Sequence, residues 1–140
     1  MLRSLEQERA KYAWECIQSV EGDIDLEDKY KSYVRKTSSY IQVNGLGNTL
    51  AFYKSKFEAD LRKKGEEKLS VEKKAYKLIY DHLNGWFNKQ FRENKDILNW
   101  IISENTSSIK VFQATKEIIA LLNWLEKFAE AELRDKETVG

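Results

Sequence analysis

Two side chains in the sequence, His82 and Cys16, have the chemistry of a general base and a nucleophile. His82 is the only histidine, and it falls on the apolar stripe of an expected helix, where a histidine is more often part of the core than a catalyst. Cys16 lies on another apolar stripe, and free cysteine is among the most buried residue types. Neither residue has a recognisable catalytic partner in the sequence. We therefore expect a protein that is not an enzyme.

Metal binding has little support in the sequence. One histidine and one cysteine cannot build a typical zinc site. The acidic run at residues 23–28 lacks the spacing and the terminal glutamate of a calcium-binding loop. Acidic side chains at the start of a helix are explained by their attraction to the helix dipole. We expect no metal site and no cofactor.

A glycine-rich segment, Gly45-Leu-Gly47, comes just before an expected helix. It lacks the third glycine of a dinucleotide-binding fingerprint, and no predicted strand precedes it. The simpler interpretation is that Gly45 ends one helix and the next helix begins directly after it. A turn of this kind still exposes backbone N–H groups, which suit a phosphate of an RNA backbone.

Basic residues are concentrated in the middle of the chain. Residues 29–95 contain sixteen basic and seven acidic side chains. Residues 1–28 contain three basic and eight acidic side chains, and residues 96–140 contain five basic and eight acidic ones, so the overall charge is only +1. This asymmetry is typical of a surface that binds a polyanion. Lysines that only solubilise exposed helices would give the same counts, so charge alone leaves both interpretations open.

Polar and basic side chains that face away from the expected apolar stripes are suited to phosphate contacts that do not depend on sequence. The residues predicted to contact an RNA backbone are Arg35, Lys36, Asn48, Lys54, Lys56 and Lys63. Phe52, in the same segment, either stacks on a base or packs against a second helix or a partner subunit, and we favour packing.

Arg9 and Trp14 are unusual in the first expected helix. Arg9 lies among apolar positions, where it either extends to solvent or marks a contact with another chain. Trp14 lies away from the apolar stripe, and a tryptophan in such a position often anchors an interface. Arg9, Trp14 and Phe52 are therefore the residues that we assign to a subunit interface.

Helices must position all of these side chains. The sequence contains no proline, which helix interiors exclude, and its apolar residues recur at helical spacing. Asp25 and Ser70 are the expected N-caps of two helices. The predicted fold is all-α, a single compact bundle of about six helices within one domain, residues 1–140, with a frayed tail at 135–140. The expected helices are Ser4–Glu21, Leu26–Val43, Leu46–Lys64, Val71–Phe91, Lys95–Ser103 and Ser108–Arg134.

Composition places the chain among soluble globular proteins. Its residues are 41% hydrophobic and 34% charged, which is too apolar for disorder and too charged for a membrane protein. The N-terminal residues carry charge from position 3 and have no apolar signal core. We expect a cytoplasmic protein without membrane contact.

Three blocks of the sequence resemble the small subunit of the type III-B (Cmr) CRISPR effector complex. They are Leu5–Glu15, Asn44–Lys56 and Thr115–Glu130, of which the central Asn-Gly-Leu-Gly block is the most specific. The resemblance implies a non-catalytic helical subunit that stacks with copies of itself and with other Cmr subunits along a ribonucleoprotein filament. It also implies a role in antiviral defence, in which the subunit supports the duplex of guide RNA and target RNA.

A rival interpretation makes the protein a purely structural scaffold without direct RNA contact. Its basic middle would then meet acidic patches on partner subunits. Residues 1–28, which are strongly acidic, offer such a patch for head-to-tail contacts between copies. The two interpretations are compatible with one another.

Overall fold

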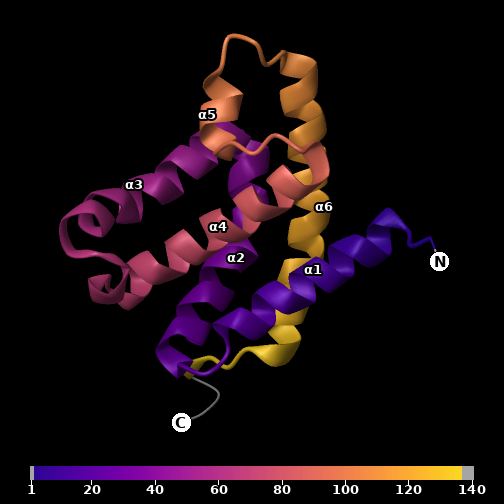
Figure 1. Ribbon diagram of the computed structural model, residues 1–140. Helices are drawn as coiled ribbons and strands as arrows, with labels where there is room; N and C mark the ends of the chain where they lie inside the picture. Colours follow the sequence, from indigo (N-terminus) through magenta and orange to yellow (C-terminus); the bar gives the residue numbers. More distant parts are fainter. Residues whose placement is uncertain (1, 137–140) are drawn as a thin grey trace.

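The described part of the chain, residues 2–136, forms six α-helices and one short 3-10 turn, arranged as an all-α bundle (Figure 1). The computed structural model describes residues 2–136, and within this range no strand is present. The predicted all-α bundle of about six helices is confirmed. The elements are α1 Leu5–Val20, α2 Ile24–Asn44, α3 Leu46–Lys64, the 3-10 turn η1 Glu66–Lys68, α4 Val71–Phe91, α5 Ile97–Ile102 and α6 Ser108–Glu132.

Polar side chains begin most of these helices by accepting a hydrogen bond from an open backbone N–H group. Ser4 caps α1 in a capping box with Gln7, and Ser70 caps α4 as predicted. The predicted cap of α2, Asp25, is wrong. Helix α2 begins at Ile24, so the residue before it, Asp23, is the cap. Asp25 donates its backbone N–H to Asp23 Oδ1 at 3.0 Å.

Glycines with positive φ separate α3 from its neighbours. Gly45 has φ 89° and ends α2 by donating its N–H to Ile41 O at 2.8 Å. The same residue is the N-cap of α3, because Thr49 N donates to Gly45 O at 3.1 Å. Gly65, with φ 84°, ends α3. Because glycine reaches positive φ without strain, the chain can reverse sharply at both ends of α3.

Helices α2, α4 and α6 form the middle of the bundle. Helix α6 packs against α1 and α2, and α4 packs against α2 and α3. Figure 1 shows α3 and the start of α4 projecting together on the side away from α6. Helix α3 therefore has one long face without a helical neighbour.

Large aromatic side chains fill the core between these helices. Trp86, Tyr30, Tyr53 and Phe87 are fully buried. Tyr53 of α3 shares a hydrogen bond of 2.7 Å with Thr37 of α2, so the two helices lie side by side at this level. Burying each large apolar side chain contributes about 1.5–3 kcal/mol, and aromatic pairs add to this. This packing fixes the position of α3 against α2.

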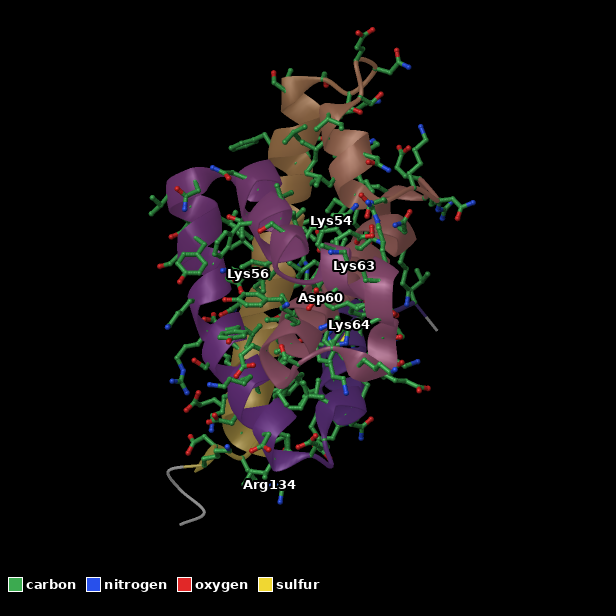
Figure 2. The ribbon with its side chains drawn as sticks, turned by 90° about the vertical axis from the view of Figure 1, so that its left-hand side faces the viewer. Lys54, Lys56, Asp60, Lys63, Lys64 and Arg134 are labelled. Atoms are coloured by element: carbon green, nitrogen blue, oxygen red, sulfur yellow. The ribbon has the colours of Figure 1, made fainter. Side chains whose placement is uncertain are left out.

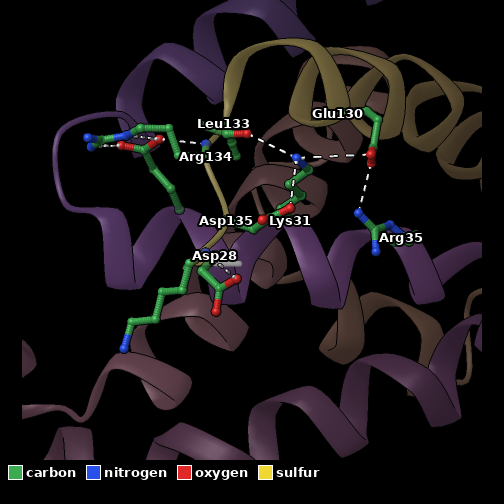
Figure 3. Close-up of polar contacts among 9 residues, drawn as sticks. Asp28, Lys31, Arg35, Glu130, Leu133, Arg134 and Asp135 are labelled. Carbon is green, nitrogen blue, oxygen red and sulfur yellow. Dashed lines mark hydrogen bonds and ion pairs between the residues drawn. The ribbon is translucent and has the colours of Figure 1, made fainter. Parts of the chain in front are cut away.

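The C-terminal segment that follows α6 crosses back over α2 (Figure 3). Fraying was expected from Asp135 onward, and this stays a prediction. In the structure Asp135 forms an ion pair with Lys31 at 3.4 Å, and Lys136 forms one with Asp25 at 2.7 Å. Residues 137–140 of the expected tail lie outside the described residues. Among residues 2–136, no helix has the length and apolarity needed to cross a bilayer.

Candidate nucleic-acid interface

His82 and Cys16, the two candidates for chemistry, both lie between helices. The Nδ1 atom of His82 is 2.8 Å from the Tyr30 hydroxyl, and burial lowers the pKa of His82 to about 4. Burial raises the pKa of the Cys16 thiol to about 12. At neutral pH both groups are uncharged, and neither is an activated nucleophile or base. No group of three or more His, Cys, Asp or Glu side chains suited to a metal ion occurs among the described residues.

The predicted RNA-contacting residues of α3 lie on two different flanks of the helix. Asn48 and Lys56 lie on the flank towards α2, together with Phe52, and all three are exposed. The Lys56 ammonium is 4.8 Å from the centre of the Phe52 ring. Lys54 is half-buried on the other flank, 5.9 Å from the Tyr80 ring centre of α4. Figure 2 shows the two lysines apart, Lys54 beside α4 and Lys56 towards α2.

Charges at the C-terminal end of α3 are partly compensated. Lys63 and Lys64 lie around Asp60, which also accepts a hydrogen bond from Lys73 of α4 (Figure 2). The hydrogen bond from Lys73 and the nearby lysines hold the pKa of Asp60 below its usual value. Lys63 is exposed and has no ion pair among the described residues, so it keeps its charge at the surface. Cations in the last turn also interact favourably with the helix dipole.

Arg35 and Lys36 of α2 point in different directions. Arg35 turns towards α6, where its Nη2 atom donates to Glu130 at 2.9 Å (Figure 3). Lys36 is exposed, and no acidic side chain in the described part of the chain pairs with it. Tyr40 and Asn44 follow Lys36 by one and by two helical turns, so the three residues lie on the same side of α2, the side that faces α3. Of the two residues, only Lys36 lies on the same side as Asn48 and Lys56.

A groove separates the facing ends of α2 and α3. It has a volume of about 320 Å³ and is lined by Tyr40 and Asn44 of α2 and by Asn48, Thr49 and Phe52 of α3. Among the described residues no side chain caps α3, so the N–H groups of its first turn have no side-chain partner.

The structure thus places Asn48 and Phe52 in one groove with Lys56 beside the Phe52 ring, and it directs Arg35 towards α6 and Lys54 towards α4. The sequence analysis missed Tyr40 and Asn44. Their spacing of four residues, beside the buried Thr37 and Ile41, was the signal that could have found them.

Arg9 and Trp14, assigned to a subunit interface, both have partners within the chain. The Nε and Nη2 atoms of Arg9 donate to the two carboxylate oxygens of Glu117 at 2.7 and 2.8 Å. Glu117 Oε2 also accepts a hydrogen bond from Trp86 Nε1 at 2.9 Å, so this carboxylate joins α1, α4 and α6. Trp14 packs edge-on against Phe128, with ring centres 5.4 Å apart. Their role in an interface between subunits stays a prediction.

A second charged cluster, which sequence reasoning missed, holds the C-terminal segment on α2. Glu27 is buried and accepts hydrogen bonds from Gly22 N and from the backbone and side chain of Arg134. The side-chain hydrogen bond from Arg134 is the largest of the effects that lower the pKa of Glu27 to about 2. Lys31 donates to Leu133 O at 3.1 Å (Figure 3). Glu27 was interpreted only as part of an acidic helix start, because its partner lies 107 residues away.

A family model matches nearly the whole chain. Residues 5–132 match the model of the family described as CRISPR-associated protein (Cas_Cmr5). The matched range contains every helix described above, the groove and the Arg9–Glu117 pair. The chain therefore belongs to the Cas_Cmr5 family and is a CRISPR-associated small subunit of the Cmr (type III-B) kind.

Proposed function

We propose that this protein is a non-catalytic subunit of a Cmr effector complex that contacts RNA backbone through the facing flanks of α2 and α3. In this role it supports the pairing of guide RNA with target RNA. Family membership supports a place in the complex with other subunits. The observation that carries RNA contact is a pair of exposed lysines, Lys36 of α2 and Lys56 of α3, that form no ion pair among residues 2–136. They lie on either side of the junction where α3 begins without a side-chain cap.

The arrangement suits a phosphate chain because each element supplies a different kind of contact. Lys36 lies nine residues before Gly45 and Lys56 lies eleven residues after it, so each of the two helices that form the groove carries one of these lysines. Between them, the open N–H groups of the first turn of α3 present partial positive charge. Asn48 adds an exposed amide, and contacts of these types do not depend on sequence.

The test is the salt dependence of target-RNA binding by the assembled complex. The double variant Lys36→Ala/Lys56→Ala should weaken binding and lower the slope of log K against log salt by about 1 to 2, because each phosphate contact contributes roughly one. Lys127→Ala is the matched control, because Lys127 is exposed on α6, away from this surface. Equal affinity and equal slopes for the double variant and the control would contradict RNA contact at this surface.

The alternative is a scaffold that mediates stacking between subunits without touching RNA. It is favoured by exposed apolar side chains near the connection from α5 to α6, where Ile102, Ile109 and Phe112 are 72%, 69% and 63% exposed. Apolar groups this exposed are typical of protein contact surfaces. If this alternative holds alone, the purified protein should self-associate with rising concentration, and a gel shift should show no RNA binding at physiological salt.

A further inference from the structure

The groove between α2 and α3 is lined by aromatic rings and by amide groups, which together suit a single flat, polar ring. Tyr40 and Phe52 contribute two aromatic rings that are 38% and 45% exposed. Asn44 and Asn48 contribute exposed amides, each of which can both donate and accept hydrogen bonds. The volume of about 320 Å³ is at the lower end for ligand pockets, which span about 300–1,000 Å³.

Thr49 adds a hydroxyl group to the polar lining of this groove. Its Oγ1 atom is the one buried side-chain oxygen or nitrogen in the described part of the chain that has no hydrogen-bond partner. Thr49 is 3% exposed and lines the groove. Buried hydroxyl groups are nearly always paired, because an unpaired one loses its hydration without compensation. Among residues 2–136, the wall of the groove therefore holds a hydroxyl group with which no other protein group pairs.

We propose that the groove binds one unpaired nucleobase of single-stranded RNA. This inference rests on the proposed RNA contact and adds that the protein holds a base as well as the backbone. The base lies against Phe52, and its hydrogen-bonding edge meets Asn44 and Asn48. The Lys56 ammonium, 4.8 Å from the Phe52 ring centre, is placed for the phosphate of the same nucleotide. Stacking on an aromatic ring tolerates every base, and the amides add a preference among bases.

The surroundings favour a base over an apolar peptide side chain. A groove for an apolar side chain would be lined mostly by aliphatic groups, whereas four of the five lining residues here carry amide or hydroxyl groups. Phe52 also packs edge-on against Tyr76 of α4, with ring centres 6.3 Å apart, and this contact fixes the orientation of the Phe52 ring.

The experiment compares two single-stranded probes on the full-length protein at low salt. One probe is a fluorescently labelled oligouridine, and the other is a ribose-phosphate oligomer of the same length without bases. The wild-type protein should bind oligouridine at least about five-fold more tightly, which is the lower end of the effect of one stacked base. Phe52→Leu should abolish this difference, and Phe52→Tyr, which keeps the ring, should retain it.

The outcomes separate this proposal from the proposed function. Equal binding of both probes by wild type, together with weaker binding by Lys36→Ala/Lys56→Ala, would overturn the base site and leave the backbone contact standing. No binding of either probe at about 50 mM salt would overturn both for the isolated subunit. An unchanged preference in both Phe52→Leu and the double variant Asn44→Ala/Asn48→Ala would mean that the base is bound elsewhere.

Discussion

Replacing Glu27 by glutamine tests how firmly the C-terminal segment is held on α2. The substitution keeps the size of the side chain and removes its charge. In the structure the buried carboxylate accepts from Gly22 N at 2.9 Å, from Arg134 N at 2.9 Å and from Arg134 Nη2 at 2.8 Å. A glutamine amide would direct its own N–H groups at some of these donors. The segment after α6 should then lose its main attachment.

The size of the effect follows from the charge state of Glu27. A pKa lowered from 4.5 to about 2 corresponds to about 3 kcal/mol of stabilisation at neutral pH. Removing one member of a buried ion pair typically costs about 3–5 kcal/mol. The side chain of Arg134 is 49% exposed and can regain water, so the lower figure applies. Glu27→Gln should therefore reduce the free energy of unfolding by about 3 kcal/mol.

The effect should also depend on pH in a definite direction. The folded-state pKa of Glu27 lies below its unfolded value, so its stabilisation is present above about pH 5 and is lost as pH falls towards 2. The difference in stability between wild type and Glu27→Gln should shrink to roughly half between about pH 7 and about pH 3.

Urea unfolding followed by far-ultraviolet circular dichroism measures both effects, with an unchanged m-value as the check on two-state behaviour. Glu104→Gln is the matched control, because Glu104 is exposed and has no ion pair among residues 2–136, so its loss should change stability by less than about 0.5 kcal/mol. A change below about 1 kcal/mol for Glu27→Gln, with no pH dependence, would refute this account of the attachment.

Three further predictions concern single side chains in the bundle. Thr49→Val removes the unpaired Oγ1 hydroxyl and keeps the side-chain shape, so it should raise the free energy of unfolding, measured by urea titration, by about 1 kcal/mol. A lower free energy of unfolding would show that the hydroxyl is paired in solution. Arg9→Ala leaves the half-buried Glu117 carboxylate with only its hydrogen bond from Trp86, so the free energy of unfolding should fall by about 2–3 kcal/mol. Thermal unfolding measures this change, and an unchanged unfolding midpoint would contradict the stabilising role of the Arg9–Glu117 pair. Burial lowers the pKa of His82 to about 4, so the free energy of unfolding should fall as pH drops from about 6.5 towards 4. NMR titration of the His82 ring should show no charge change near neutral pH, and a titration midpoint near 6.5 would mean that the ring is solvated.

Local signals explain why the helices were predictable. The bounds of α3 and α4 agree with the predicted Leu46–Lys64 and Val71–Phe91. Glycines with positive φ at both ends of α3, and a serine before α4, act on the few residues next to them. Asp25 was the wrong cap because two aspartates near Gly22 offer similar chemistry, and only the backbone path decides which one comes first.

The surface was less predictable, because it depends on which helix faces which. Lys54 and Lys56 were grouped by their closeness in sequence, although two residues along a helix are turned by about 200°. The partner of Arg35, Glu130, is 95 residues away, and that of Arg9, Glu117, is 108 residues away. Such pairs follow from how helices cross, which the spacing within one helix does not specify.

Cys16 gives the protein a built-in reporter of helix movement. It is the only cysteine in the sequence, it is 7% exposed, and its raised pKa keeps it as the unreactive thiol. A thiol reagent can reach it only while α1 is separated from the rest of the core. The labelling rate at fixed reagent concentration therefore measures how often α1 opens, without any engineered probe. Comparing that rate for the free subunit and for the assembled complex would show whether assembly clamps α1 onto α6.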